Sequence, residues 1–477
     1  MASYLQNKIL CQCQPGADVL FDNFRNDISC EVLKQFRKRG VTLQNLLDLQ
    51  MVIPAIYPWD EEYDNLRYNV NRRFVVFPFI IVMAETTKHV AIAVEWAYKR
   101  EIQVVARSGS GCFENFSLIN GMIIDQSRRT NISIQDSVSI LEPGCLLGPT
   151  QLELSKEGLA FVGGSSENTC VAGLTLGGGI GFLARRYGLS SDNLLEAEVV
   201  LYNGEVVIAN SKNNVDLFWA LRGAGNSNYG IVTKFVFKVH RISEVIIFDA
   251  IFQYDRIKEV INAWQYWAPF TDDNLTAELN IYNDRLMITG QYLGCKESLK
   301  RLLQPIIKMN PVEYTVQRVP FIDAVRHLLS DKWYPFFKNK SGFVETYLPS
   351  EAINIIDEYM KCGGPEDHVE FHAFGGMVSR IPSNKTAFPH RAGTLYWCHI
   401  QCHWAKQDCT DNKLKWVNNF YNELEPYLKG AYVNAADIDL MCPLEKYYGN
   451  NLSKLMKIKK IYDPKNIFNY PQSIPPE

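Results

Sequence analysis

The sequence lacks the features that would place the protein in a membrane, on nucleic acid or among secreted proteins. No uncharged apolar run approaches the roughly 20 residues that span a bilayer. The opening residues show no basic start followed by a sustained apolar core, so no signal peptide is expected. The net charge of −3 gives no whole-molecule attraction for nucleic acid or anionic lipid. We therefore expect a cytoplasmic protein that binds neither membrane nor nucleic acid.

The cysteines do not form the dense framework of a small disulfide-rich domain, because only twelve are spread over 477 residues. We expect most of these thiols to be free. Cys11 and Cys13 could ligate a metal ion, but no second pair follows at zinc-finger spacing. The sequence therefore predicts no metal site.

A chain of 477 residues is too long for one hydrophobic core and should divide into two or three domains. Residues 1–54 contain helix-like stretches without recognisable chemistry, which predicts an N-terminal helical extension. Beyond Val239 strands alternate with long helices, which is typical of an α+β domain with a largely antiparallel sheet. The segment Tyr432–Pro476 is rich in aromatic, Asn and Pro residues and is predicted to be irregular. Strand, helix and strand patterns predict a βαβ unit over Phe79–Met83, Lys88–Lys99 and Ile102–Ala106.

Two glycine-rich segments carry the strongest chemical signal. Arg107–Gly111 (RSGSG) directly follows the predicted strand Val104–Ala106, and small residues there let backbone amides approach an anion. A tight turn is the alternative for this segment. The second segment, Gly173–Gly181 (GLTLGGGIG), would make a poor regular element, and close approach to a pyrophosphate explains its glycines. It lacks the Gly-Lys-Ser/Thr end of a Walker loop and the GxGxxG entry to a helix of a Rossmann site.

A third segment leads from an amphipathic turn through glycines into a β-branched strand. It comprises Asp216–Gly225 followed by Asn228–Val232. Its glycines and the start of the strand offer a third set of backbone donors to the same ligand.

Together these segments resemble the berberine bridge enzyme-like flavoproteins of the vanillyl-alcohol oxidase superfamily. The similar stretches include ARSGSGCFENFS, GLTLGGGIGFLARRYGLSSDN, DLFWALRGAGNSNYGIVT and the C-terminal YYGNNLSKLMKIKKIYDPKNIFNYPQSIP. The resemblance runs in order from about Tyr57 to the C-terminus. It implies an α+β fold with a bipartite PCMH-type FAD-binding domain, formed by residues 55–240 and the returning segment 430–477. Residues 241–429 would form a substrate domain with an antiparallel sheet covered by helices.

The resemblance implies FAD as cofactor, with its pyrophosphate on the first two glycine loops. The residues that it assigns to the cofactor are Arg107, Ser108, Gly109, Ser110, Gly111, Gly173, Leu174, Gly177, Gly178, Gly179, Gly181, Gly230, Ile231 and Asn469.

The sequence departs from the family at the positions that attach the flavin covalently. The histidine that ends the family's RSGGH loop is replaced by Gly111, and the family's tethering cysteine aligns with Ser166. Leu174 replaces the histidine of the family's GGH motif, and Cys170 lies four residues away from the cysteine position. We therefore expect FAD to be held without a covalent bond.

The expected catalytic residues are His399, Gln401 and Tyr432. Alternation along a strand places Trp397, His399, Gln401 and His403 on one face, with His399 at the family's polar position as a candidate base. The family's second tyrosine in YVNY is replaced by Ala435. Cys398, His399, Cys402 and His403 split between the two faces of a strand, so they are not expected to bind a metal together.

These features favour an FAD-dependent oxidoreductase that oxidises a hydroxylated small molecule by hydride transfer to flavin N5. The alternative is a catalytically degenerate oxidase fold reused as a structural or assembly protein, such as a virion component. The lost tether and catalytic positions motivate that alternative, which would involve self-association.

Overall fold

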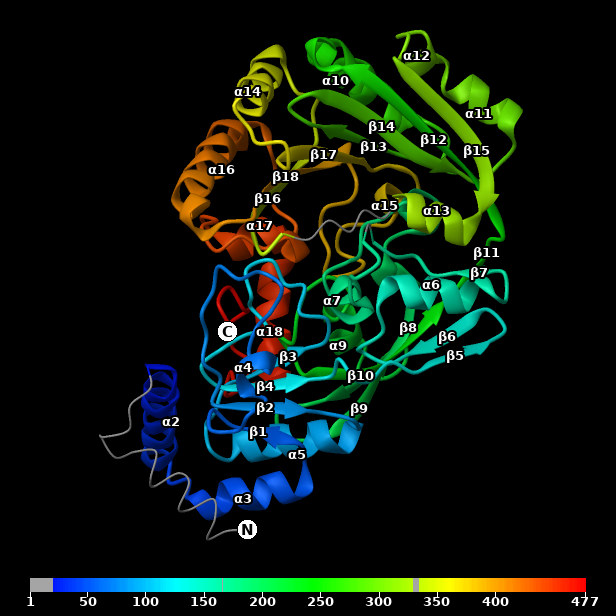
Figure 1. The fold of residues 1–477 in the computed structure, drawn as a ribbon. Helices are drawn as coiled ribbons and strands as arrows, with labels where there is room; N and C mark the ends of the chain where they lie inside the picture. Colours follow the sequence, from blue (N-terminus) through cyan, green and yellow to red (C-terminus); the bar gives the residue numbers. More distant parts are fainter. Residues whose placement is uncertain (1–19, 165, 329–333) are drawn as a thin grey trace.

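The computed structural model of the chain describes residues 20–164, 166–328 and 334–477, and Figure 1 labels its elements. A seven-stranded sheet with helices on its outer side forms the upper part of the view, and a four-stranded and a five-stranded sheet lie in the lower part. This mixture of helices and sheets confirms the predicted α+β class. Among the described helices, none combines the length and apolar character that a bilayer crossing requires.

Two helices precede the first sheet, α2 (Leu20–Lys38) and α3 (Leu43–Val52). Thr42 caps α3, because its hydroxyl accepts a hydrogen bond from the Asn45 amide while the Asn45 side chain accepts one from the Thr42 amide. The apolar face of α3 packs into the same cluster as the strands of the first sheet. Residues 1–19 of the predicted extension, with Cys11 and Cys13, lie outside the described residues.

The first sheet has the order β1-β2-β4-β3. Strands β2 (Ile80–Met83) and β3 (Val104–Arg107) both run parallel to β4 (Met122–Asp125), and β1 (Ala55–Ile56) is an antiparallel edge. Helix α5 (Thr87–Tyr98) connects β2 to β3, which confirms the predicted βαβ unit. The first glycine-rich loop therefore leaves the carboxyl end of a buried parallel strand.

The second sheet is antiparallel, in the order β5-β6-β10-β8-β9. Its strands are β5 (Ile132–Gln135), β6 (Val138–Leu141), β8 (Leu194–Val200), β9 (Val206–Asn210) and β10 (Ile231–Lys238). A separate two-stranded sheet pairs β7 (Leu159–Ala160) with β11 (His240–Arg241). The helices in this part of the chain are α4 (Tyr63–Leu66), α6 (Leu147–Ser155), α7 (Val171–Leu176), α8 (Ala184–Tyr187) and α9 (Val215–Ala220).

The seven-stranded sheet is antiparallel throughout, in the order β15-β12-β14-β13-β17-β18-β16. Its strands are β12 (Glu244–Gln253), β13 (Leu275–Ile281), β14 (Arg285–Tyr292), β15 (Glu313–Pro320), β16 (Phe336–Val344), β17 (His368–Ala373) and β18 (Tyr396–Trp404). The helices of this part are α10 (Ile257–Trp267), α11 (Lys296–Leu302), α12 (Gln304–Ile307), α13 (Phe321–Leu328), α14 (Ser350–Lys361), α15 (Gly376–Arg380) and α16 (Thr410–Leu424).

The two faces of this sheet differ in character. Helices α10, α14 and α16 lie on the outer face (Figure 1), where Trp264 packs against Phe371 and Tyr396 with ring centroids 5.8 and 5.1 Å away. Because neighbouring residues of a strand point to opposite faces, Glu370 and His399 project from the inner face. A polar inner face on a domain sheet indicates a ligand site rather than a second layer of core.

The C-terminal segment returns to the first sheet, where the Val104 amide donates a hydrogen bond to the carbonyl of Ile467 at 2.8 Å. The expectation that Tyr432–Pro476 is irregular was wrong, because it contains α17 (Pro443–Tyr448) and α18 (Leu452–Tyr462). Helix α18 buries Leu455 and Ile458 on one side and exposes most of its lysines on the other.

A buried network of charges joins the loop after β3, strand β16 and the C-terminal segment. Lys338 of β16 contacts Glu114 at 2.6 Å and Asp437 at 2.5 Å, and Lys340 contacts Asp437 at 2.6 Å. The partners come from far apart in the sequence, so the network fixes residues 432–437 against both the seven-stranded sheet and the loop after β3.

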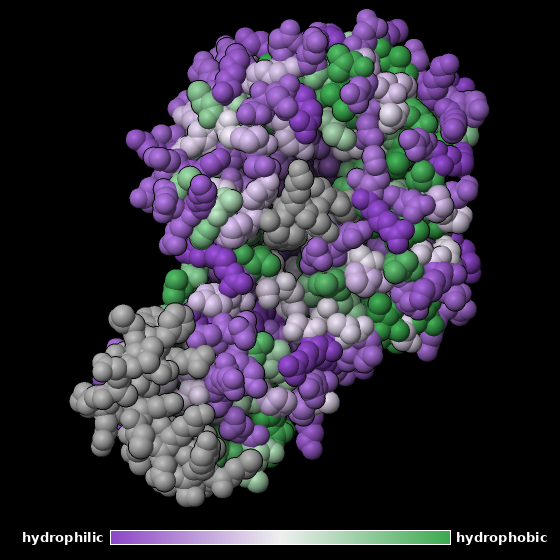
Figure 2. Space-filling model, in the orientation of Figure 1, coloured by the Kyte–Doolittle hydropathy of each residue, from purple (hydrophilic) through white to green (hydrophobic). Residues whose placement is uncertain are grey.

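The face drawn in Figure 2 carries no single large apolar patch outside the grey atoms. Outside the grey atoms, hydrophilic residues predominate there and apolar residues are interspersed among them.

We expect the stability of the protein to fall as the pH drops from about 6.5 towards 4, in part through His390. Loss of water around the ring lowers the pKa of His390 to about 4, and its Nε2 lies 3.2 Å from the carbonyl oxygen of Tyr447. Because the pKa is depressed in the folded state, unfolding takes up a proton, so the stabilisation is present above pH 6.5 and is lost below it. The free energy of unfolding, measured with urea, should fall between pH 7 and pH 4.5 in both proteins. The fall should be roughly 2 kcal/mol smaller in His390→Gln than in the natural chain. Equal losses in the two proteins would contradict this assignment.

Candidate functional site

A cavity of about 650 Å³ separates the inner face of the seven-stranded sheet from the glycine-rich loops. This volume is within the range usual for cofactor and small-molecule sites. One side of the cavity is formed by the loop residues 107–111, 172–174, 225–227 and 230. The other side is formed by residues of β13, β14, β16, β17 and β18, most of them polar or aromatic. The two sides of this one cavity therefore offer a ligand different chemical groups.

The loop after β3 lines the cavity with Arg107 to Gly111. Ser110 has φ +57°, a left-handed conformation that is common in loops whose successive amides gather around an anion. Within the described residues, the amides of Ser108 to Gly111 donate no hydrogen bond to another group of the chain. The Arg107 guanidinium is held by the buried carboxylate of Asp125, so the backbone rather than this side chain is available to a ligand.

Glycine serves different purposes along this loop. A Cβ at Gly109 would lie 2.4 Å from the Cβ of Cys170, so glycine here lets the first two loops pack together. A Cβ at Gly111 would meet nothing closer than a carbonyl oxygen at 3.9 Å, and one at Gly173 would meet nothing within 4 Å. The space beside Gly111 and Gly173 is therefore open to a ligand.

The second segment reaches the cavity through Gly173, Leu174, Leu176 and Ile180, so Gly173 is its one glycine on the lining. Val171–Leu176 is helix α7, and the later glycines are required by packing: a Cβ would lie 2.1 Å from Asn434 Oδ1 at Gly177, 2.2 Å from Ser190 Oγ at Gly179 and 1.8 Å from the Gly163 carbonyl oxygen at Gly181. A Cβ at Gly178 would lie 2.9 Å from the Phe388 ring. Gly177, Gly178, Gly179 and Gly181 thus lie behind the cavity wall, although the sequence predicted that they hold the cofactor.

Of the remaining predicted cofactor residues, Gly230 lines the cavity, whereas Ile231 and Asn469 do not. Gly230 lines the cavity together with Gly225, Asn226 and Ser227, whereas the Ile231 side chain lies in the core. Asn469 does not reach the cavity, because its side chain accepts a hydrogen bond from Ser473 Oγ at 2.9 Å within a turn. Tyr470 and Gln472 line the wall there instead, and the sequence analysis missed both.

The positions of the family's covalent tethers also lie on this wall, and none offers a reactive nucleophile of the expected type. Gly111 has no side chain and Leu174 is a hydrocarbon, while Ser166 has a hydroxyl in place of a thiol. Two cysteines do line the cavity, but burial raises the pKa of the Cys112 thiol to about 11 and that of the Cys170 thiol to about 12. Both thiols are therefore protonated and poorly nucleophilic near neutral pH.

The opposite wall consists of cross-strand rows of side chains on the inner face of the sheet. Asn280, Glu370, His399 and Ser341 are successive partners across four strands, so Glu370 stands between an amide and an imidazole. The four β18 residues predicted to share a face all line the cavity, namely Trp397, His399, Gln401 and His403. Tyr282, Phe337 and Phe113 add aromatic surface between these polar groups.

His399 is buried, and neither of its ring nitrogens has a hydrogen-bond partner in the described structure. Its ring stacks on Trp397 with centroids 4.5 Å apart, and its Nδ1 lies 3.7 Å from Glu370 Oε2, an ion-pair separation longer than a hydrogen bond. Gln401 Nε2 donates a hydrogen bond to the same Glu370 oxygen at 3.0 Å. The ring is fixed in orientation and has a nitrogen available to a ligand in the cavity.

Tyr432 contacts both sides of the cavity. Its Oη accepts hydrogen bonds from the Gly179 amide and from Asn434 Nδ2, each at 3.0 Å. Burial raises the pKa of Tyr432, so the phenol keeps its proton and acts as a donor rather than as a base. Ala435 leaves the neighbouring position without a phenol.

Sequence reasoning missed Glu278 and Glu370 on this wall and His372, which lies beside Glu278. Burial and the neighbouring Glu370 carboxylate raise the pKa of Glu278 to about 7. The signal was present as polar residues at every second position, Glu278 and Asn280 in β13 and His368, Glu370 and His372 in β17, within otherwise apolar strands.

Comparison with known proteins adds independent information. A family model described as "FAD binding domain" matches residues 78–210, and one described as "Berberine and berberine like" matches residues 431–475. The chain is 34% identical over 431 residues to the "Uncharacterized FAD-linked oxidoreductase YgaK" of Bacillus subtilis, covering 87% of this chain and 95% of that protein. The solved structure of Physcomitrella patens BBE-like 1 superposes with a TM-score of 0.85 at 29% identity, covering 92% of this chain and all of that one. A chitooligosaccharide oxidase superposes with a TM-score of 0.83 at 25% identity, covering 90% and 98%.

Proposed function

The chain belongs to the berberine bridge enzyme-like family of FAD-linked oxidoreductases and binds FAD, and from this premise we propose that it oxidises a hydroxylated small molecule with FAD held by non-covalent contacts alone. The observation that carries the proposal is that one cavity has both kinds of group on its walls. On one side lie backbone amides that donate no hydrogen bond within the described residues, and on the other lies His399, whose ring nitrogens have no hydrogen-bond partner there. When bound, FAD supplies a hydride acceptor at flavin N5.

The residues of the cavity fit a flavin dinucleotide. The amides of Ser108 to Gly111 are donors for the pyrophosphate, and the open space at Gly111 and Gly173 leaves room for it. Absence of a nucleophile at Gly111 and Leu174, with protonated thiols at Cys112 and Cys170, supports attachment without a covalent bond.

Residues on the inner face of the seven-stranded sheet would accept the proton that the substrate hydroxyl loses. We assign His399 as the group that takes the hydroxyl proton of the substrate at Nε2, while Nδ1 faces the Glu370 carboxylate. Gln401 positions Glu370, and Tyr432 donates a hydrogen bond into the cavity from an oxygen held by the Gly179 amide. The stacked rings around His399 exclude water from the reacting group.

The proposed substrate is a hydroxylated small molecule, of which the oligosaccharides in the titles of two structural neighbours are one kind. Alternating aromatic rings and polar side chains on the inner face suit a polyhydroxylated ring. The relatives reported above have oxidoreductase and oxidase names, and no observation favours a structural or virion role for this chain.

An anaerobic substrate screen tests this proposal. The purified protein, loaded with FAD, is mixed with a panel of sugars, alcohols and hydroxy acids, and bleaching of the visible flavin band is followed. At least one hydroxylated compound should bleach the flavin. Bleaching by a chemical reductant but by no hydroxylated compound would contradict the proposed reaction.

A further inference from the structure

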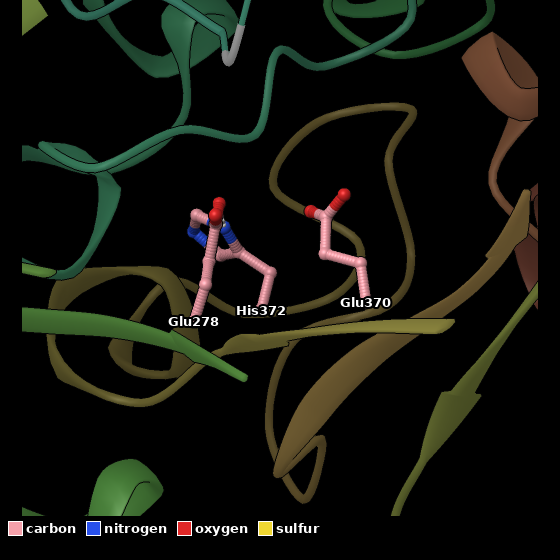
Figure 3. A group of neighbouring side chains, drawn as sticks. All are labelled: Glu278, Glu370 and His372. Carbon is pink, nitrogen blue, oxygen red and sulfur yellow. Dashed lines mark hydrogen bonds and ion pairs between the residues drawn. The ribbon is translucent and has the colours of Figure 1, made fainter. Parts of the chain in front are cut away.

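We propose that Glu278, Glu370 and His372 form a binding site for a divalent transition-metal ion on the substrate side of the cavity. Their donor atoms all lie within 4.8 Å of one another. Figure 3 shows the three side chains projecting from the same side of the sheet, with Glu278 and His372 close together and Glu370 beside them. The ion would hold an oxygen of the substrate, and only this last step rests on the proposed function.

The charge balance of buried carboxylates sets this group apart. Seven Asp and Glu residues are buried in the described part of the chain, and Glu278 and Glu370 are the two without a lysine or arginine at ion-pair distance. The other five are paired, in Asp125–Arg107, Glu114–Lys338, Asp367–Lys413, Asp437–Lys340 and Asp463–Lys459. Among the described residues, only histidines lie at ion-pair distance from these two carboxylates, so a bound metal ion would supply positive charge that no lysine or arginine supplies there.

Unsatisfied atoms show that the group has capacity for a further ligand. Glu370 Oε1 and His372 Nε2 have no hydrogen-bond partner in the described structure, although Glu370 is only 7% exposed and His372 only 1%. His372 Nδ1 lies 2.6 Å from Glu278 Oε1, so nitrogen and oxygen donors are already side by side. A bound ion would replace the proton between them.

The donor set indicates the class of ion. Two carboxylate oxygens and one imidazole nitrogen suit Zn²⁺, Mn²⁺ or Fe²⁺, whereas Mg²⁺ and Ca²⁺ prefer oxygen ligands alone. An organic ammonium would also neutralise the carboxylates, but the imidazole nitrogen beside them adds a donor atom that suits a metal ion. Glu278 and Glu370 line the cavity, so open coordination positions face the substrate. Gln401 on the neighbouring strand donates a hydrogen bond to the Glu370 carboxylate, the kind of supporting contact that fixes metal ligands.

Equilibrium dialysis of the FAD-loaded, chelator-treated protein against Zn²⁺ tests the proposal, with bound zinc and bound flavin both quantified. We expect about one zinc ion per chain at micromolar concentrations. Glu278→Gln and His372→Gln should each weaken binding by more than the roughly 10–100-fold that loss of an outer-shell partner costs. His327→Gln is the matched control, because His327 forms a comparable pair with Asp249 at 2.8 Å outside the proposed site.

Flavin content reports folding in every variant, so a failure of metal binding is distinguishable from a failure of FAD binding. No zinc uptake by the FAD-loaded protein, or equal uptake by all three variants, would overturn the site. Perturbation of the flavin spectrum by methylammonium but not by Zn²⁺, dependent on Glu278, would show an amine site instead and would also overturn it.

Discussion

Replacing His399 with alanine is expected to slow reduction of the flavin by substrate about 10²–10⁴-fold, the usual contribution of a positioned general base. The imidazole is buried, neither of its nitrogens has a hydrogen-bond partner in the described structure, and its ring stacks on Trp397 and Phe113. The measurement is the limiting rate of flavin bleaching in anaerobic stopped-flow experiments with a compound from the screen. The loss should fall mainly on this rate and less on the apparent affinity for substrate.

Two further variants separate proton transfer from packing at this position. His399→Gln keeps a polar side chain of similar reach but cannot accept the proton, so it should remain slow while retaining normal flavin content. His89→Gln changes a histidine at the N-terminus of α5, away from the cavity lining, and should react at the natural rate. A rate for His399→Gln within about twofold of the natural protein would rule out His399 as the base.

Gly111→His is expected to convert a freely released flavin into one that is mostly bound through a covalent bond. The backbone at Gly111 is not in the left-handed region, and a Cβ there approaches nothing closer than 3.9 Å, so the side chain fits without strain. The resemblance of the RSGSG loop to the family's RSGGH loop implies that residue 111 takes the place of the tethering histidine, and this loop lines the cavity. The new N–C bond to the flavin 8α-carbon forms with loss of one hydrogen from each partner, and O2 reoxidises the flavin that is reduced in this step. Intact-protein mass spectrometry under denaturing conditions should therefore show a mass increase equal to FAD less two hydrogen atoms.

Gly111→Gln is the matched control, because it fills the same space with a side chain that is not a nucleophile. It should bind FAD and release all of it on denaturation. A Gly111→His protein that binds FAD with a normal spectrum yet forms no adduct would mean that residue 111 does not face the reactive edge of the flavin.

The overall fold and the cofactor could be predicted from the sequence because they depend on local motifs. The RSGSG loop after a buried strand and the C-terminal motif identified the family, and the PCMH-type fold with FAD is confirmed by the relatives and structural neighbours. Alternation along β18 correctly grouped Trp397, His399, Gln401 and His403, because strand geometry alone decides which residues share a face.

The parts that the sequence analysis missed depend on contacts between distant segments. Asn280, Glu370 and His399 form one row only through the register of β13, β17 and β18, which no local pattern reveals. Gly177, Gly179 and Gly181 were assigned to the ligand, but their neighbours Asn434, Ser190 and Gly163 show that glycine is needed there for packing. A glycine-rich sequence does not by itself distinguish a residue that approaches a ligand from one that approaches another part of the chain.

The central claim, FAD held in this cavity without a covalent bond, is tested most directly by the visible spectrum of the purified protein before and after acid precipitation. We predict a flavin spectrum in the native protein and complete transfer of the flavin to the supernatant. Flavin that stays in the pellet would contradict the claim and show a tether elsewhere on the cavity wall, with Cys112 and Cys170 the first residues to test. A colourless protein that takes up no added FAD would contradict FAD binding itself.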